Sequence, residues 1–250
     1  MTVRQGDFML RVEHLTRRFG GFTAIDDISL GIEEGEMHCI IGPNGAGKTT
    51  LFNLITAKLK PDSGRIFLRD RDITDLTTEE ICHLGIGRKF QAPSIFTHLT
   101  VIENILVAGY GKYGFSHLLF RGVQERDRAL AMEILRKIEL DSKRDHLASS
   151  LSHGERQWLE IGMLLRNEPD LLLLDEPTAG MTPAETRETA YLIRDNLSDL
   201  TTVVIEHDLK FLREIAEEVT VLHNGRILAT GRFDEIENNE EVRKVYLGRE

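Results

Sequence analysis

The most informative stretch of the sequence is Gly42-Pro43-Asn44-Gly45-Ala46-Gly47-Lys48-Thr49-Thr50 (GPNGAGKTT), which we call the phosphate loop. It matches the pattern G-x-x-x-x-G-K-[ST], in which glycines let backbone N–H groups converge on phosphate oxygens. A short apolar run, MHCII, precedes it and a helical pattern, TTLFNLITAKL, follows it. The stretch therefore predicts a phosphate-binding turn between a strand and a helix, where the helix N-terminus adds a dipole favourable to anions.

Two residues of the phosphate loop carry specific chemistry. Lys48 supplies a positive charge to the β- and γ-phosphates of a nucleotide, and the hydroxyl of Thr49 is suited to bind Mg²⁺. A plain glycine-rich turn is the alternative, and the position between a strand and a helix disfavours it.

Acidic residues end a later apolar strand, LLLLDE. Asp175 fits the carboxylate that binds Mg²⁺ at the end of a strand, and Glu176 is suited to polarise a water molecule for attack on the γ-phosphate. An apolar strand that ends in Asp-Glu is a weak signal alone. The phosphate loop upstream makes the functional interpretation much the stronger one.

Two further polar residues follow predicted elements. His207 comes after the strand TTVVIE, and parallel strands deliver their carboxyl ends to one crevice, so we expect His207 to face the same phosphates. Gln91, in RKFQAP, begins a helical block, and we expect it to contact Mg²⁺ at the hinge between that block and the core. Each residue alone also fits an ordinary solvated position.

The signature segment, LSHGE (residues 151–155), begins another helix. Ser152 and Glu155 form the pattern of a capping box. Gly154 in the first turn costs about 1 kcal/mol relative to alanine, so a helix cap alone does not explain it. Its bare backbone N–H, next to the Ser152 hydroxyl, favours anion binding.

The composition is that of an ordinary soluble globular protein. The chain has 250 residues, of which 41% are apolar and 29% charged, and its net charge is −10, so we expect no nucleic acid partner. The cysteines, Cys39 and Cys82, have no metal-ligand spacing and indicate a reducing compartment. No signal-like or membrane-spanning apolar run is apparent, so we expect any work at a membrane to depend on a partner.

The pattern along the chain predicts one α/β domain with a helical insertion. Short strands fill the first 35 or so residues, helical periodicity dominates from about 92 to 165, and strands alternate with helices afterwards. GYGKYGFSHLLFRG reads as a loop or insertion, Asn224-Gly225 as a hairpin turn, and the tail as a short polar helix. We expect a core of about 1–91 and 166–236, a helical subdomain of about 92–165 and a tail of 237–250.

The order Phe19, phosphate loop, Gln91, LSHGE, LLLLDEP and His207 resembles the ATP-binding cassette subunit of an ABC transporter over essentially the whole chain. The resemblance implies a P-loop NTPase (RecA-like) core with an N-terminal antiparallel β subdomain and an inserted α-helical subdomain. It implies an ATPase that uses ATP and Mg²⁺, with Phe19 at the nucleotide. It also implies that Ser152 and Gly154 bind the γ-phosphate of an ATP held by the opposite subunit.

The same resemblance implies the partners. They are membrane permease subunits, a second ATPase subunit or a second copy of this chain, and, indirectly, a periplasmic or extracellular solute-binding protein. The chain is then peripheral, on the cytoplasmic face of the inner membrane. We expect the surface near Ala92–Val107 to dock on the permease.

The string LSHGERQWLEIGMLL is more narrowly similar to the urea-type members of the branched-chain amino acid uptake branch. It implies import of urea or short-chain amides, with branched-chain amino acid import and, less favoured, export as alternatives. A soluble ABC protein of translation or chromosome work is disfavoured because no second cassette or long coiled coil is present. His153 and Glu155 depart from the usual Leu-Ser-Gly-Gly-Gln, and Thr182 stands where the family often has aspartate.

Overall fold

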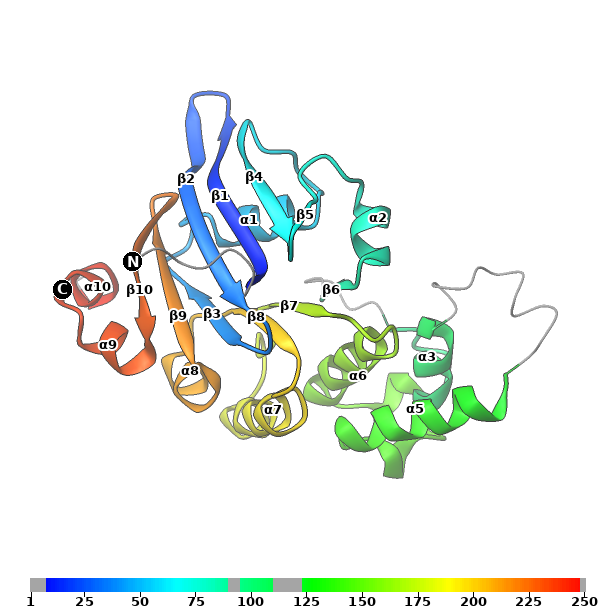
Figure 1. Cartoon of the computed structure of the whole chain (residues 1–250). Coiled ribbons are helices and arrows are strands. Elements are labelled where there is room, and N and C mark those ends of the chain that lie inside the picture. The colour runs from blue at the N-terminus through cyan, green and yellow to red at the C-terminus, as the bar shows by residue number, and fades with distance from the viewer. Residues whose placement is uncertain (1–7, 90–94, 110–122, 248–250) are drawn as a thin grey trace.

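The computed structural model describes residues 8–89, 95–109 and 123–247, which form two sheets with helices around them (Figure 1). The first sheet is antiparallel and has the strand order β2-β1-β4-β5. Its strands are β1 (Phe8–Phe19), β2 (Phe22–Glu33), β4 (Ser63–Leu68) and β5 (Arg71–Asp72). This is the antiparallel β subdomain that the resemblance implies.

The second sheet has the order β10-β9-β3-β8-β7-β6. Its strands are β3 (Met37–Ile41), β6 (Ile86–Arg88), β7 (Leu171–Asp175), β8 (Thr201–Ile205), β9 (Glu218–His223) and β10 (Arg226–Arg232). Neighbours from β9 to β6 pair in parallel, whereas β10 pairs antiparallel with β9. The carboxyl ends of β3, β7 and β8 therefore meet at one edge of the sheet.

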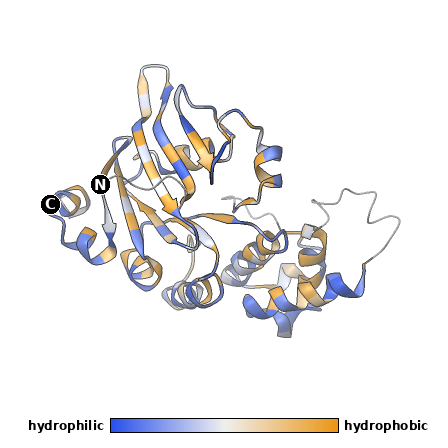
Figure 2. Cartoon of the chain, viewed as in Figure 1, coloured by the Kyte–Doolittle hydropathy of each residue, from blue (hydrophilic) through white to orange (hydrophobic). Residues whose placement is uncertain are grey.

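The second sheet is buried on both faces, as its continuous apolar strands predict. Leu171 and Leu173 of β7 belong to a cluster with the first sheet and α1 (Lys48–Ile55). Leu172 and Leu174 belong to a cluster with the helices of the opposite face. Figure 2 shows apolar residues concentrated on these central strands. The phosphate loop is thus attached to a helix that lies between two sheets.

The helices on the other face include two groups from different parts of the chain (Figure 1). One group is α3 (Val101–Ala108), α5 (Glu125–Lys137) and α6 (His153–Leu165), with the short 3-10 turns η2 (Asp141–Lys143) and η3 (Ala148–Ser150) between α5 and α6. The other is α7 (Pro183–Asn196) and α8 (Leu209–Ile215). The first group forms the helical insert between β6 and β7.

Local signals predicted several boundaries correctly. The capping box predicted at Ser152 begins α6, and α2 (Thr78–His83) and α7 also begin with a capping box; each box has both reciprocal hydrogen bonds. Asn224 and Gly225 have φ values of 49° and 77°, as a type I′ hairpin turn requires.

Two predicted helices were wrong in extent. The helix expected to run to Leu59 ends at Ile55, because Ala57 has left-handed backbone with φ 52°. The tail contains two helices, α9 (Phe233–Asn238) and α10 (Glu240–Leu247), because Asn239 has extended backbone and its side chain caps the second. Most of GYGKYGFSHLLFRG lies outside the described residues.

Candidate functional site

The phosphate loop is held in shape by close neighbours. Gly47 has φ 108°, and a Cβ there would lie 2.6 Å from the carbonyl oxygen of Ala24 in β2. A Cβ on Gly42 would lie 2.3 Å from the carbonyl oxygen of Leu222 in β9. The glycines are therefore required by close backbone packing, not only by the turn itself.

Lys48 is the first residue of α1 and its side chain lies over the loop. Its Nζ donates hydrogen bonds to the carbonyl oxygens of Gly42 at 2.7 Å and Pro43 at 3.2 Å. Burial lowers the pKa of Lys48, while the carboxylates of Glu176 and Asp175 act in the opposite direction. The acidic residues at the end of β7 are thus close enough to Lys48 to stabilise its charge.

Asp175 ends β7 and is almost fully buried, with 1% of its surface exposed. Its Oδ2 accepts a hydrogen bond from Arg88 Nη2 at 3.2 Å. Its Oδ1 is buried and has no hydrogen-bond partner among the described residues. A buried carboxylate oxygen left without a donor is suited to a hard cation, which takes oxygen ligands. Asp175 therefore fits a Mg²⁺ ion, and Thr49 lies exposed in the first turn of α1, beside Lys48.

Arg88, which the sequence analysis did not single out, connects this carboxylate to α1. Its Nη1 donates to Asn53 Oδ1 at 2.7 Å and to Thr56 Oγ1 at 3.0 Å. Burial lowers the pKa of Arg88, and the charge of Asp175 acts against that effect. One guanidinium thus fixes the end of β7 relative to the helix that carries the phosphate loop.

Glu176 adopts a strained backbone. Its φ is 49°, in the left-handed region that costs a residue with a side chain about 1–2 kcal/mol. Its N–H donates to the carbonyl oxygen of Ile205 in β8 at 2.9 Å, which holds the turn against the neighbouring strand. Strain of this kind is concentrated at functional sites, because the surrounding structure must maintain it.

His207 lies just beyond β8, and its side chain is 65% exposed. It is positioned by Glu206, a fully buried carboxylate that the sequence analysis missed. Glu206 accepts from the N–H and the hydroxyl of Thr178 at 3.0 and 2.5 Å, and from the His207 N–H at 3.0 Å. The signal available in the sequence was an acidic residue at the end of the apolar run TTVVIE, as Asp175 is at the end of LLLLD.

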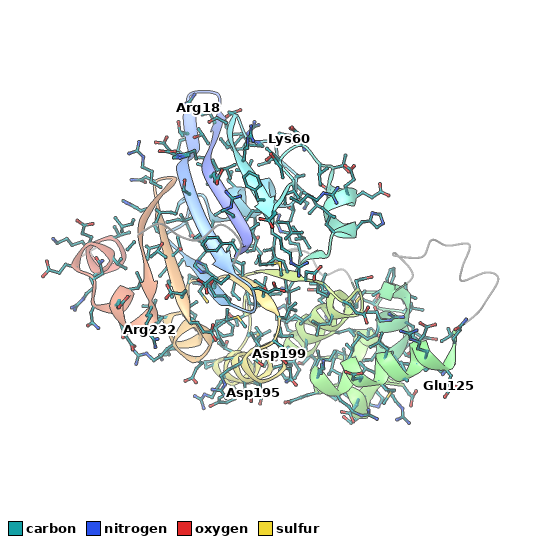
Figure 3. The ribbon with its side chains drawn as sticks, in the orientation of Figure 1. Arg18, Lys60, Glu125, Asp195, Asp199 and Arg232 are labelled. Carbon is teal, nitrogen blue, oxygen red and sulfur yellow. The ribbon has the colours of Figure 1, made fainter. Side chains whose placement is uncertain are left out.

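Phe19 lies at the end of β1, where 43% of its surface is exposed and the Arg17 guanidinium is 4.9 Å from its ring. Figure 3 labels the adjacent Arg18 at the tip of the β1–β2 hairpin. The same hairpin contacts the phosphate loop through Ala24. Gln91 lies outside the described residues.

The N-terminus of α6 is where the signature segment lies. Ser152 is the N-cap, and its Oγ accepts from the Glu155 N–H at 3.2 Å. Within the described residues, the outward hydrogen bonds of Ser152 and Gly154 run to Glu185 in α7, not to the phosphate loop. His153 Nε2 lies 2.9 Å from the carbonyl oxygen of Ala179. The structure therefore places the signature segment against the loop before α7.

A second buried ion pair, also missed, joins the helical insert to the core. Lys89 Nζ lies 3.9 Å from Glu160 Oε2 of α6, and both side chains are nearly fully buried. Burial lowers the pKa of Lys89, and Glu160 acts in the opposite direction. Lys89 also donates its N–H to the carbonyl oxygen of Leu173. The segment that leads to Gln91 is thus anchored to both β7 and α6.

Comparison with known proteins gives matches along most of the chain. The family described as ABC transporter matches residues 25–179, and the one described as Branched-chain amino acid ATP-binding cassette transporter matches residues 226–250. LivG of Salmonella typhimurium, a high-affinity branched-chain amino acid transport ATP-binding protein, is 41% identical over 249 residues. These residues cover 96% of this chain and 98% of LivG.

Solved structures give the same result. The ADP conformation of MJ1267, an ATP-binding cassette of an ABC transporter, matches with a TM-score of 0.84 and 33% identity, over 97% of this chain and 99% of that one. The dimeric post-hydrolysis structure of the ATP-binding cassette MJ0796, bound to ADP and Pi, matches with a TM-score of 0.74 and 27% identity. That match covers 90% of this chain and 99% of MJ0796.

Proposed function

The chain belongs to the ATP-binding subunits of ABC transporters, in the branched-chain amino acid branch, and is an ATPase; we propose that it drives the uptake of branched-chain amino acids. The sequence alone favoured urea, with branched-chain amino acids as the alternative. The names of the relatives support branched-chain amino acids over urea. Urea remains the second candidate, on the string LSHGERQWLEIGMLL alone.

One observation carries the catalytic assignment: the phosphate loop, Asp175 and the Glu206–His207 pair follow strands whose carboxyl ends meet at one sheet edge. In this proposal the backbone of residues 42–50 holds the phosphates of ATP. Lys48 exchanges the carbonyl oxygens of its own loop for phosphate oxygens. Phe19 lies at the nucleotide, on the hairpin that supports the loop.

The remaining roles follow from charge and geometry. Asp175, the Thr49 hydroxyl and Gln91 would hold Mg²⁺, and the ion would neutralise phosphate charge. Glu176 accepts a proton from the water that attacks the γ-phosphate, since its strained backbone keeps it at the strand end. His207, fixed by Glu206, donates a hydrogen bond to the γ-phosphate. Ser152 and Gly154 supply their donors to an ATP held by a partner ATPase subunit.

The proposed permease site is the surface near Ala92–Val107, of which residues 92–94 lie outside the described residues, together with a groove beside it between the core and the helical insert. The groove has a volume of about 460 Å³ and lies between α2, β6 and the ends of α3 and α6. Its lining includes Ile86, Ala108 and Leu164, and it adjoins Arg88, which contacts Asp175. A partner seated here would sense the ATP site through one side chain.

None of the helices in the described part of the chain has the length and hydropathy needed to cross a bilayer.

Three measurements test the proposal. Lys48→Ala should abolish ATP binding and hydrolysis, because the phosphates lose their counter-charge, while Lys137→Ala on the exposed face of α5 should not. Phe96→Asp, at a side chain that is 49% exposed beside α3, should reduce co-purification with the permease, whereas Tyr191→Asp on α7 should not. A strain lacking the chain should lose leucine uptake; loss of urea uptake alone would select the second candidate.

A further inference from the structure

One carboxylate joins the N-termini of α6 and α7. The Oε2 atom of Glu185 accepts from the N–H and the hydroxyl of Thr182, both at 2.9 Å, and so completes the capping box of α7. Its Oε1 atom accepts from the Ser152 hydroxyl at 3.4 Å and from the Gly154 N–H at 3.3 Å. Glu185 therefore accepts hydrogen bonds from both donors of the signature segment, the Ser152 hydroxyl and the Gly154 N–H, within the same chain.

The site is built for an anion. Hydrogen bonds from the N–H and hydroxyl of Thr182, and then from Gly154 and Ser152, lower the pKa of Glu185, so the side chain is a carboxylate at neutral pH. Two helix N-termini face it, and their dipoles stabilise negative charge. A Cβ on Gly154 would lie 3.1 Å from Glu185 Oε1, so glycine at this position permits the close approach.

This inference rests on the proposed function, in which Ser152 and Gly154 receive the γ-phosphate of the partner's ATP. We infer that the Glu185 carboxylate accepts the hydrogen bonds of these two donors while the chain is unpaired. Two subunits then pair only when a γ-phosphate replaces this carboxylate. Two anions cannot share the same two donors, because their charges repel at hydrogen-bond distance. Glu185 thereby raises the dissociation constant of the ATP-bound pair. ADP lacks the γ-phosphate and does not displace the Glu185 carboxylate.

The exchange is local. When Oε1 leaves α6, Oε2 keeps its bonds to Thr182 and the cap of α7 survives. The two helices stay joined by His153, whose Nε2 lies 2.9 Å from the Ala179 carbonyl oxygen, and by Trp158, which donates to Thr189 Oγ1 at 2.8 Å. Displacement of one carboxylate oxygen therefore needs no separation of the helices.

The test removes the charge of the Glu185 side chain and keeps its shape. In a Glu176→Gln background, which slows hydrolysis, Glu185→Gln retains the capping-box pattern but removes the negative charge. For each ATP site at which Glu185 is replaced, we expect the dissociation constant of the ATP-bound pair to fall about fivefold at low salt, the effect of one charge pair at about 4 Å in water. Sedimentation velocity over a range of chain concentrations, with ATP and with ADP, measures it. If the partner is a related subunit, the mixture is titrated instead.

Matched variants separate the explanations. Glu188→Gln makes the same charge change on an exposed residue one turn along α7 and should leave pairing unchanged. High salt should strengthen pairing of the chain that retains Glu185 more than pairing of Glu185→Gln, because screening weakens repulsion. Equal pairing of Glu185→Gln and Glu188→Gln, with pairing still lost in Ser152→Ala, would overturn the inference alone. Pairing unchanged by both Lys48→Ala and Ser152→Ala would overturn the proposed function.

Discussion

Arg88 Nη2 lies 3.2 Å from Asp175 Oδ2, and the two side chains are only 6% and 1% exposed. The same guanidinium reaches Asn53 and Thr56 in and after α1. Removing charge from both partners of such a pair is often tolerated, whereas removing one partner leaves an uncompensated buried charge. The pair therefore fixes the Asp175 carboxylate, the proposed Mg²⁺ ligand, relative to the phosphate loop.

Replacing Arg88 alone should be costly. We expect Arg88→Met to lower the free energy of unfolding by about 3–5 kcal/mol, because Asp175 is left buried and unpaired. Chemical denaturation measures this, and the double variant Arg88→Met/Asp175→Asn should recover a large part of the loss. Equal stability of Arg88→Met and the parent chain would show that the pair does not hold the strand end.

The glycines of the phosphate loop should differ sharply from glycines elsewhere. Gly47→Ala places a Cβ 2.6 Å from the Ala24 carbonyl oxygen at φ 108°, so we expect loss of ATP binding and of stability. Gly21→Ala, where a Cβ meets nothing within 4 Å and φ is ordinary, is the matched control and should bind ATP normally. Titration calorimetry compares them; normal affinity in Gly47→Ala would contradict the assigned packing.

Capping-box carboxylates should make the fold sensitive to acid. Hydrogen bonds from the N–H and hydroxyl of Thr100 lower the pKa of Glu103 below 4.5, and those of Thr77 do the same to the pKa of Glu80. A folded-state pKa below the unfolded value means stability that is fully present above about pH 4.5 and lost as pH falls through the folded-state pKa. We expect denaturation midpoints to fall over that range, and less steeply in Glu103→Gln.

The two thiols should react differently. Cys39 is fully buried in β3, and burial raises its pKa well above the usual range, so it should not react in the native chain. Cys82 is exposed at the end of α2. A chromogenic thiol reagent should therefore modify one thiol in the native protein and two in denaturant. Two reactive native thiols would mean that β3 opens readily.

Features that depend on near neighbours in the sequence were predictable. The phosphate loop, the capping boxes and the apolar strands each rest on contacts within a few residues, and the structure has them in place. The contacts that were missed join residues far apart in the sequence. Arg88 bonds to a carboxylate 87 positions away, Glu206 to a threonine 28 away and Glu185 to a glycine 31 away. No local pattern marks such pairs, because only strand and helix packing brings them together.

The hydrogen bond from Trp158 Nε1 to Thr189 Oγ1 has a spectroscopic consequence. Trp158 is the single tryptophan of the chain, it is 7% exposed, and it sits at the contact between α6 and α7. Its indole emission therefore arises from one defined environment. Any step that pulls these two helices apart would wet the ring and shift that emission to the red, so the chain carries its own optical probe of this junction, without an added dye.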